Sequence, residues 1–349
     1  MLMKLQQSWQ KIFVLFAVSL KNTLWPPGDY AIIKPRLSVV LFYLLANAGK
    51  GGMNMCANQI QWYPGHMAKT KRNIEADLAL VDMLIEVIDA RIPAASRNPD
   101  LQPYTGKKCH LLLLNKADLA SPRATQRWLA YYRSQGYIPA AINAARKQGL
   151  KELQTAINQA SAPLLDKLQR RGRLPRAVRA MVVGIPNCGK STVINALAPA
   201  ASAKTGNKPG VTRGRQWVKT NVGVELLDTP GMLWPRFANE DIAFKLAVCG
   251  SISDGVFPIY SVACDLALLL RELAPKALAE RYRLPELAGS GEEILIQIAA
   301  ARGMLGAGGR VRDEDAALLL IQEFRSGRIG RITLEEAPAK VSVRAEEQP

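Results

Sequence analysis

Histidine is scarce in this 349-residue chain, and its cysteines are not paired. Two His residues and five scattered Cys residues, with no C-x-x-C spacing, argue against a zinc knuckle or a histidine-rich metal centre. The odd number of cysteines also argues against a disulfide framework and for a reducing compartment. No apolar run approaches the roughly 20 residues that a membrane-spanning helix needs. At this length, the chain is expected to hold two globular domains, each with its own core.

Acidic residues are also few relative to basic ones. Only 29 Asp and Glu residues stand against 46 Lys and Arg residues, so the formal net charge is +17 and the sequence pI is near 9.8. Such a charge predicts an anionic partner, either nucleic acid or a membrane surface. The basic residues are clustered, and contacts to a phosphate backbone explain the clusters better than solvated helix faces do. The clusters are Lys69, Lys71 and Arg72; residues 170–179; Arg213 and Arg215; Arg310 and Arg312; and Arg325, Arg328 and Arg331.

Residues 1–52 differ from the rest of the chain. They contain two short apolar runs, 12–20 and 37–46, and the second leads into an A-N-A pattern typical of signal cleavage. Three interpretations are open: a secretory signal, an organelle-targeting or membrane-surface segment, and an upstream stretch without function because translation starts at Met53 or Met55. We favour the last interpretation. If the extension is present, we expect it to be poorly ordered.

Residues 184–192 read G-I-P-N-C-G-K-S-T and stand between an apolar strand, 177–183, and a helix that continues from 193. In that context G-x-x-x-x-G-K-[ST] predicts a phosphate-binding loop, because backbone N–H groups and a helix N-terminus converge on an anion. We expect Lys190 to reach the β- and γ-phosphates and the Ser191 hydroxyl to hold Mg²⁺. The loop residues expected to contact the nucleotide are Pro186, Asn187, Cys188, Gly189, Lys190, Ser191 and Thr192.

An N-K-A-D motif begins at Asn115, directly after a strand of four leucines. The Asp118 carboxylate can accept hydrogen bonds from both N1–H and the 2-amino group of guanine, which adenine does not offer. We expect Asn115 to brace the loop and the stem of Lys116 to lie over the base. A supporting loop is predicted after the next strand, at Asn143 and Ala144, where a backbone N–H would approach the base oxygen.

A D-T-P-G motif follows another predicted strand. Asp228 can orient Mg²⁺ through a water, and Gly231 lets a backbone N–H face the γ-phosphate, so that loss of this phosphate releases the loop. Thr212 is the candidate switch threonine that contacts Mg²⁺, the alternative being an ordinary loop threonine. Met232 follows the motif, and its apolar side chain cannot orient an attacking water. Hydrolysis by the chain alone is therefore expected to be slow.

The order of the motifs is unusual. An ordinary G domain begins with the phosphate loop and ends with N-K-x-D and its supporting loop, whereas here the last two come first. Alternating strands and helices predict a doubly wound, mostly parallel α/β sheet with its ligand at the carboxyl ends of the strands. We therefore expect a circularly permuted P-loop G domain at residues 59–237 (motif order G4-G5-G1-G2-G3), an all-helical domain at 238–335 and a flexible tail at 336–349.

This order resembles that of the circularly permuted ribosome-assembly GTPases, and most closely the ribosome biogenesis GTPase A family. Besides the loops above, the resemblance rests on W-Y-P-G-H-M-A-K at 62–69, D-A-R-I-P at 89–93, L-W-P at 233–235 and G-R-I-T-L-E at 330–335. It covers nearly all of the chain from residue 60 and does not cover 1–52. It implies a Mg²⁺-dependent GTPase that binds rRNA, assists late maturation of the large (50S) ribosomal subunit and is stimulated by that subunit.

The resemblance also implies roles for single residues. It assigns the hydrolytic role to His66, for which an RNA contact and simple packing are the alternatives. Asn187 occupies the position that helps bind a monovalent cation in potassium-stimulated GTPases, so K⁺ is a second candidate cofactor. The residues expected to act in catalysis are thus His66, Lys190 and Thr212.

Two other functions remain open for the whole chain. One is an ATP-using P-loop enzyme, and the other is a membrane-tethered G protein that uses the apolar runs of residues 1–52. We expect no stable membrane insertion and a cytoplasmic location, or an organelle stroma or matrix if residues 1–52 are a targeting segment. The sequence does not predict an oligomeric state.

Overall fold

A computed structural model of the chain describes residues 77–101, 108–172, 176–199, 216–228, 239–304, 306 and 311–338. All of them belong to one compact unit, Met55–Pro349. Residues 1–52 lie outside the described residues, as do His66, Thr212, Gly231 and Met232. The same holds for the basic residues Lys69, Lys71, Arg72, Arg213, Arg215 and Arg310. Within the described part, no helix is both long enough and apolar enough to cross a membrane.

Six strands form a single sheet in the order β3-β2-β1-β4-β6-β5. Neighbouring strands are parallel except at the edge, where β5 runs antiparallel to β6. Every residue of β1 is buried, as expected for a strand covered on both faces. The strands are β1 (Met83–Asp89), β2 (Cys109–Asn115), β3 (Ile138–Ala141), β4 (Val178–Val183), β5 (Gln216–Lys219) and β6 (Val224–Asp228).

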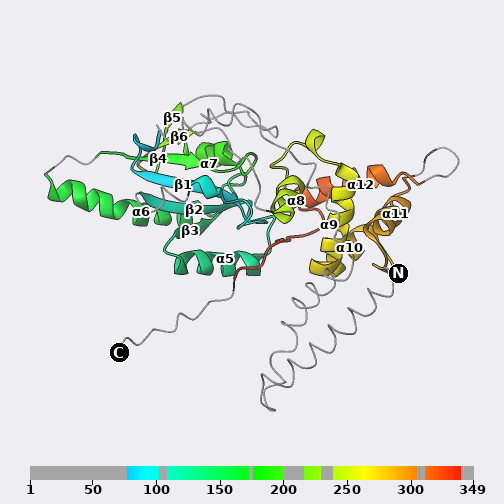
Figure 1. Cartoon of the computed structure of the whole chain (residues 1–349). Coiled ribbons are helices and arrows are strands. Elements are labelled where there is room, and N and C mark those ends of the chain that lie inside the picture. Colours follow the sequence, from blue (N-terminus) through cyan, green and yellow to red (C-terminus); the bar gives the residue numbers. More distant parts are fainter. Residues whose placement is uncertain are drawn as a thin grey trace, which may run out of the picture. The chain divides into compact units, whose positions relative to one another are not determined.

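Helices cover both faces of the sheet. Alternate residues of a strand point to opposite faces, so a strand that is buried throughout needs a covering layer on each side. Leu111 and Leu113 face the core that also contains α6 (Leu150–Arg170) and α7 (Lys190–Leu197). Leu112 and Leu114 face the opposite core, which contains residues of α5 (Pro122–Ser134). A short 3₁₀ helix, η2 (Pro99–Leu101), adds Leu101 to a smaller cluster with Leu84 and Leu227. The predicted doubly wound α/β sheet is therefore confirmed (Figure 1).

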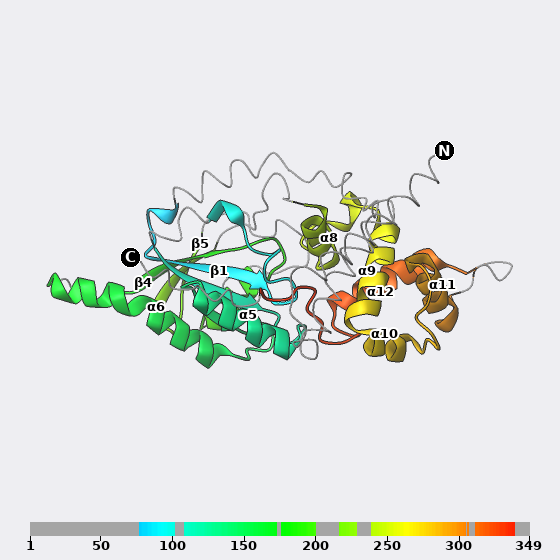
Figure 2. The same cartoon turned by 60° about the horizontal axis from the view of Figure 1, so that its bottom comes forward.

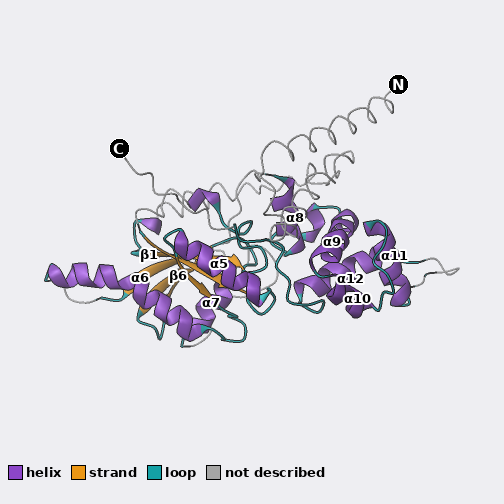
Figure 3. Ribbon diagram, turned by 90° about the horizontal axis from the view of Figure 1, so that it is seen from below, coloured by secondary structure: helices purple, strands orange, loops and turns teal. Residues whose placement is uncertain are grey.

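Beyond β6, the described residues form helices and no strand. Helix α9 contacts α8, α10, α11 and α12 (Figure 2), and Figure 3 shows only helices and loops in the part that carries α8 to α12. The Asn239 side chain caps α8, and a capping box at Ser290 starts α11. The elements are α8 (Glu240–Val248), η3 (Asp254–Val256), α9 (Ile259–Leu273), α10 (Pro275–Tyr282), α11 (Gly291–Ala301) and α12 (Asp313–Arg325).

Candidate functional site

The loops singled out in the sequence follow strands that point in the same direction. Strand β4 leads into the phosphate loop, β2 ends at Asn115, β3 precedes Asn143, and β6 ends at Asp228. The strand order reverses between β1 and β4, and such switch points are where open α/β sheets bind ligands. The sheet thus gathers these loops at one edge. The Asp228 side chain, Gly231, Thr212 and His66 lie outside the part that the structure describes.

Two glycines allow the phosphate loop to approach its neighbours closely. A Cβ on Gly184 (φ 151°) would lie 2.3 Å from the Val87 carbonyl oxygen. A Cβ on Gly189 (φ 98°) would lie 2.2 Å from Nδ2 of Asn115. Neither position can take a side chain without moving a neighbouring group. Helix α7 then begins at Lys190, whose buried ammonium donates to the Ile185 carbonyl at 2.9 Å.

Asn115 joins three of the loops. Its Nδ2 donates to the carbonyl oxygen of Cys188 in the phosphate loop at 2.9 Å. Its Oδ1 accepts the backbone N–H of Ala144 in the supporting loop at 3.1 Å. A buried carboxamide with both ends bonded fixes the relative positions of the loops that it connects. The Ala144 N–H is thus bonded to Asn115 in this structure, and its contact with the base stays a prediction.

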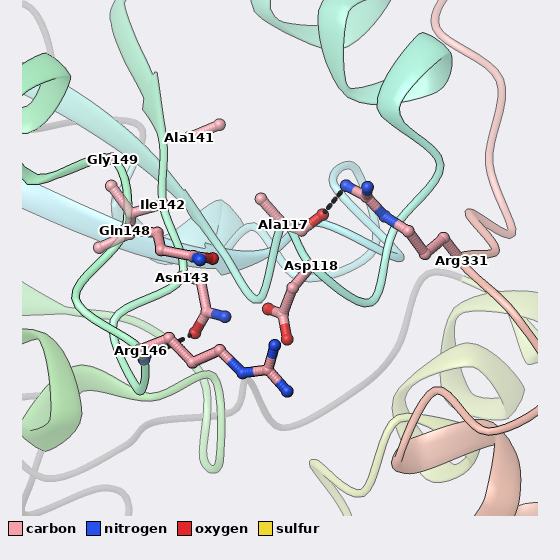
Figure 4. Close-up of a pocket in the computed structure, with 9 residues that line it drawn as sticks. All are labelled: Ala117, Asp118, Ala141, Ile142, Asn143, Arg146, Gln148, Gly149 and Arg331. Carbon is pink, nitrogen blue, oxygen red and sulfur yellow. Dashed lines mark hydrogen bonds between the residues drawn. The ribbon is translucent and has the colours of Figure 1, made fainter.

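A cavity of about 410 Å³ opens beside the N-K-A-D loop (Figure 4). Asn143 is buried in its wall, and its Oδ1 accepts the backbone N–H of Arg146 at 3.1 Å. Its Nδ2 has no hydrogen-bond partner among the described residues, and an unpaired buried donor is costly. The cavity therefore combines a carboxylate at Asp118 with a carboxamide donor. The lining residues are Ala117, Asp118, Ala141, Ile142, Asn143, Arg146, Gln148, Gly149 and Arg331.

The Lys116 side chain is held by Asp89, the last residue of β1. Its ammonium lies 2.9 Å from Oδ2 of Asp89, and Arg91 forms a bidentate pair with the same carboxylate at 2.9 and 2.7 Å. Burial by itself raises the pKa of Asp89, but the charges of Arg91 and Lys116 outweigh it and hold this pKa well below its usual range. Asp89 is therefore an ionised anchor for the lysine of the N-K-A-D motif.

The sequence placed Arg325 and Arg331 in a basic cluster expected to contact a phosphate backbone, whereas the structure shows both bonded to carbonyl oxygens within the fold. The Arg325 guanidinium instead donates to the carbonyl oxygens of Ala247 and Val248 at 2.7 and 3.0 Å. These carbonyls end α8 and attract a cation. Arg331 donates to backbone carbonyls of the N-K-A-D loop. No local spacing could have indicated either role, because both arginines reach partners far away in the sequence.

The residues present suit Mg²⁺ held mainly by phosphate oxygens. No group of three or more His, Cys, Asp or Glu side chains among the described residues could form a metal cage of its own. Ser191 is the second residue of α7, directly after Lys190. Mg²⁺ prefers oxygen ligands and binds through substrate phosphates with few protein ligands. A hydroxyl at this position fits that chemistry.

Comparisons with known proteins agree with this architecture. A family model described as "50S ribosome-binding GTPase" matches residues 179–279. Ribosome biogenesis GTPase A of Bacillus cereus is 42% identical over 276 residues, which are 79% of this chain and 93% of that protein. The protein of the same name from Thermotoga maritima is 33% identical over 79% of this chain and 94% of its own length. Mitochondrial ribosome-associated GTPase 1 of Xenopus tropicalis is 34% identical over 78% and 94%, respectively.

Two solved structures share the fold. The crystal structure of GNP-bound YlqF from Thermotoga maritima matches with a TM-score of 0.53 and 28% identity, covering 78% of this chain and all of that one. The GDP-bound structure of YlqF matches with a TM-score of 0.52 and 29% identity over 76% of this chain. The predicted circularly permuted G domain is confirmed. On this similarity, the chain belongs to the ribosome biogenesis GTPase A family and is a GTPase of ribosome assembly.

Proposed function

We propose that this GTPase binds rRNA and acts as a switch in late maturation of the large ribosomal subunit. The observation that carries the proposal is the cavity at Asp118 and Asn143, joined to the phosphate loop through Asn115. This arrangement suits guanine at one end and phosphates at the other. The net charge of +17 suits an RNA partner, and the matching family model is described as ribosome-binding.

In this proposal, base recognition falls to two side chains in the cavity. The Asp118 carboxylate accepts from N1–H and the 2-amino group of guanine, and Nδ2 of Asn143 donates to an acceptor on the same base. Adenine presents a donor where guanine presents its oxygen, so it would leave the Asp118 carboxylate and the buried Nδ2 of Asn143 unpaired. Lys116, held by Asp89, lies beside the base.

Phosphate and Mg²⁺ binding are proposed for the loop at the start of α7. Lys190 contacts the β- and γ-phosphates, and Ser191 and Thr212 hold Mg²⁺, whose charge neutralises the phosphates. Asp228 and Gly231 form the switch that responds to the γ-phosphate. The remaining nucleotide contacts are proposed for Pro186, Asn187, Cys188, Gly189 and Thr192.

Activation of the attacking water is proposed for His66, since Met232 cannot orient it. A monovalent cation near the phosphates would add positive charge. A carboxamide binds a cation through its oxygen, so Oδ1 is the atom of Asn187 that would contact K⁺. We propose K⁺ as a second cofactor on this basis.

The decisive experiment measures GTP hydrolysis by the full chain with and without large ribosomal subunits, in K⁺ and in Na⁺. We expect slow hydrolysis by the chain alone, acceleration by the subunits, and a higher rate in K⁺. An equal rate of GTP hydrolysis with and without large subunits would overturn the ribosomal assignment. Equal rates in K⁺ and Na⁺ would remove the cation from the proposal.

Two variants test the alternative functions. Asp118→Asn should shift base preference from guanine to xanthine, whereas an ATP-using enzyme would bind ATP and GTP equally well before the change. Removal of residues 1–52 should leave GTP hydrolysis and cellular location unchanged. Slower GTP hydrolysis or a changed cellular location would favour a membrane-tethered G protein.

A further inference from the structure

The chain returns to the sheet after α12. We call residues 327–336 the C-terminal strap; Figure 1 shows them in red, running from α12 toward α5. Ile332 donates its N–H to the Leu119 carbonyl at 3.0 Å, and the Thr333 hydroxyl accepts the N–H of Ser121 at 3.0 Å. Leu119 and Ser121 directly follow the N-K-A-D motif. The strap therefore lies along the loop that carries the proposed base-reading carboxylate.

Arg331 is the strap residue whose side chain is hydrogen-bonded to this loop. Its Nη2 donates to the Ala117 carbonyl at 3.0 Å, and its Nε donates to the Ala120 carbonyl at 3.2 Å. The two carbonyls stand on either side of Asp118 in the sequence, and Arg331 also lines the cavity (Figure 4). One planar guanidinium thus fixes the turn on which Asp118 sits.

The strap is itself anchored firmly to the rest of the fold. Leu334 donates its N–H to the Arg91 carbonyl at 2.8 Å, and the Glu335 carboxylate accepts the N–H groups of Ala94 and Ala95 at 2.6 and 3.1 Å. The Leu334 side chain is 6% exposed. Because these anchors lie in the turn that follows β1 and Leu334 is buried, Arg331 acts from a fixed base.

We propose that Arg331 is a positioning residue for guanine recognition: from the C-terminal strap, it holds Asp118 in the orientation that reads the base. The inference rests on the proposed function, because it takes Asp118 as the base-reading carboxylate. By linkage, a nucleotide that binds better when the strap is docked must stabilise the docked strap. The strap, which follows the last helix, therefore becomes more stable in its docked position when a nucleotide binds at the guanine end of the site.

The test compares Arg331→Met with Arg127→Met in the full chain. Arg127 ties the same strap to α5 through Glu336, and this ion pair lies away from the N-K-A-D loop. We expect Arg331→Met to weaken GDP binding by about tenfold, since two hydrogen bonds to the loop are lost. Arg331→Lys, which keeps one donor group, should restore part of the affinity. Arg127→Met should bind GDP like the parent.

Inosine diphosphate separates positioning from a general loss of structure. It lacks the 2-amino group, so a displaced Asp118 costs GDP two contacts and inosine diphosphate only one. The preference for GDP over inosine diphosphate should therefore shrink in Arg331→Met. An equal loss for both nucleotides, or no loss for either, would overturn the inference.

Two further measurements complete the test. Asp118→Asn must gain affinity for xanthosine diphosphate; if it does not, the proposed function fails, whatever Arg331 does. GDP should slow hydrogen exchange at the N–H groups of Ile332 and Leu334 in the parent, and less so in Arg331→Met. Equal protection of both amides in the two proteins would contradict the linkage between strap and nucleotide.

Discussion

At the scale of single residues, Asn143 is the clearest example of a side chain prepared for a ligand. Its backbone pairs with that of Gln148 through two hydrogen bonds of 3.0 Å, so the supporting loop is closed on itself. Its Oδ1 is used by the Arg146 N–H, which fixes which end of the carboxamide faces the cavity. The buried Nδ2 has no partner in the described part of the chain, and in the proposed function it donates to an acceptor on the base.

Replacing Asn143 should therefore weaken nucleotide binding. We expect Asn143→Ala to raise the Kd for GDP by roughly 2- to 10-fold, the range of one net hydrogen bond. Asn143→Asp should raise it further, because an acceptor then faces the guanine oxygen. Titration calorimetry checks this, with Asn158→Ala, which removes an exposed partner of Gln154 on α6, as the control. An unchanged Kd in Asn143→Ala would contradict the assignment.

Gly189 tests how close the phosphate loop must come to Asn115. An alanine Cβ there would meet Nδ2 of Asn115 and displace it from the Cys188 carbonyl. Gly223 also has a positive φ, 75°, but a Cβ there meets nothing within 4 Å. Gly223→Ala should lose about 1–2 kcal/mol of unfolding free energy through backbone strain. Gly189→Ala should lose more, because the displaced Asn115 also gives up a buried hydrogen bond. Only Gly189→Ala should also lose affinity for GDP and GTP, as measured by nucleotide titration.

At the scale of elements, the end of α8 is a junction between distant parts of the chain. The Ala247 and Val248 carbonyls accept from Arg325 of α12, and Nη2 of Arg91, beyond β1, lies 3.4 Å from the Cys249 carbonyl oxygen. The next carbonyl, that of Gly250, accepts from Asn187 of the phosphate loop. Cationic donors at the negative end of a helix dipole are favourable. The turn after α8 therefore links the phosphate loop to the last helix.

Arg325 should dominate the stability of this junction. Besides the two carbonyls, it forms a bidentate pair with Asp254 at 2.7 and 2.9 Å, whose carboxylate is half exposed. We expect Arg325→Met to lower the unfolding free energy by about 1–3 kcal/mol, because it removes charged hydrogen bonds. Asp254→Ala should lower it by less than about 1 kcal/mol, as usual for an exposed partner. Urea unfolding of both variants checks the order, and a larger effect of Asp254→Ala would refute it.

The elements were largely predictable because their signals are local. The apolar strand predicted at 177–183 is β4 at Val178–Val183, and the strand of four leucines before Asn115 is part of β2 at Cys109–Asn115. The phosphate loop was recognisable because its glycines and lysine are spaced along one stretch of chain. The hydrogen bond from Arg331 to the Ala117 carbonyl joins residues that are 214 positions apart, and it exists only because the strap returns to the sheet. Clustered charged residues in a sequence usually indicate an exposed surface. The bonds that Arg325 and Arg331 make within the fold could therefore not be predicted from the sequence alone.

At the scale of the whole molecule, the strands and the helices share one hydrophobic core. A single cluster of buried residues includes Val87 of β1, Val193 of α7, Leu266 of α9 and Phe324 of α12. Arg91 joins the end of β1 to the last helix. Its guanidinium is 5.5 Å from the Phe324 ring centroid and 3.3 Å from the Arg325 carbonyl oxygen. The sheet and α8 to α12 should therefore unfold together as one cooperative unit.

Calorimetry can test this coupling through Arg91. The parent should give one unfolding transition, and GDP should raise its temperature as a whole, because a ligand of the folded state stabilises everything that unfolds with its site. Arg91→Met breaks a buried ion pair, which we expect to remove about 3–5 kcal/mol and to split the transition into two, only one of which responds to GDP.

Arg176→Met is the matched control, because it removes an exposed pair with Asp82 that joins the start of β1 to the start of β4, away from the helices. It should leave a single transition that GDP still shifts as a whole. If Arg91→Met behaves in the same way, the shared apolar core alone couples the strands to the helices. Two transitions in Arg91→Met would instead show that the polar link through Asp89, Arg91 and the last helix is what lets the helices respond to nucleotide bound at the sheet.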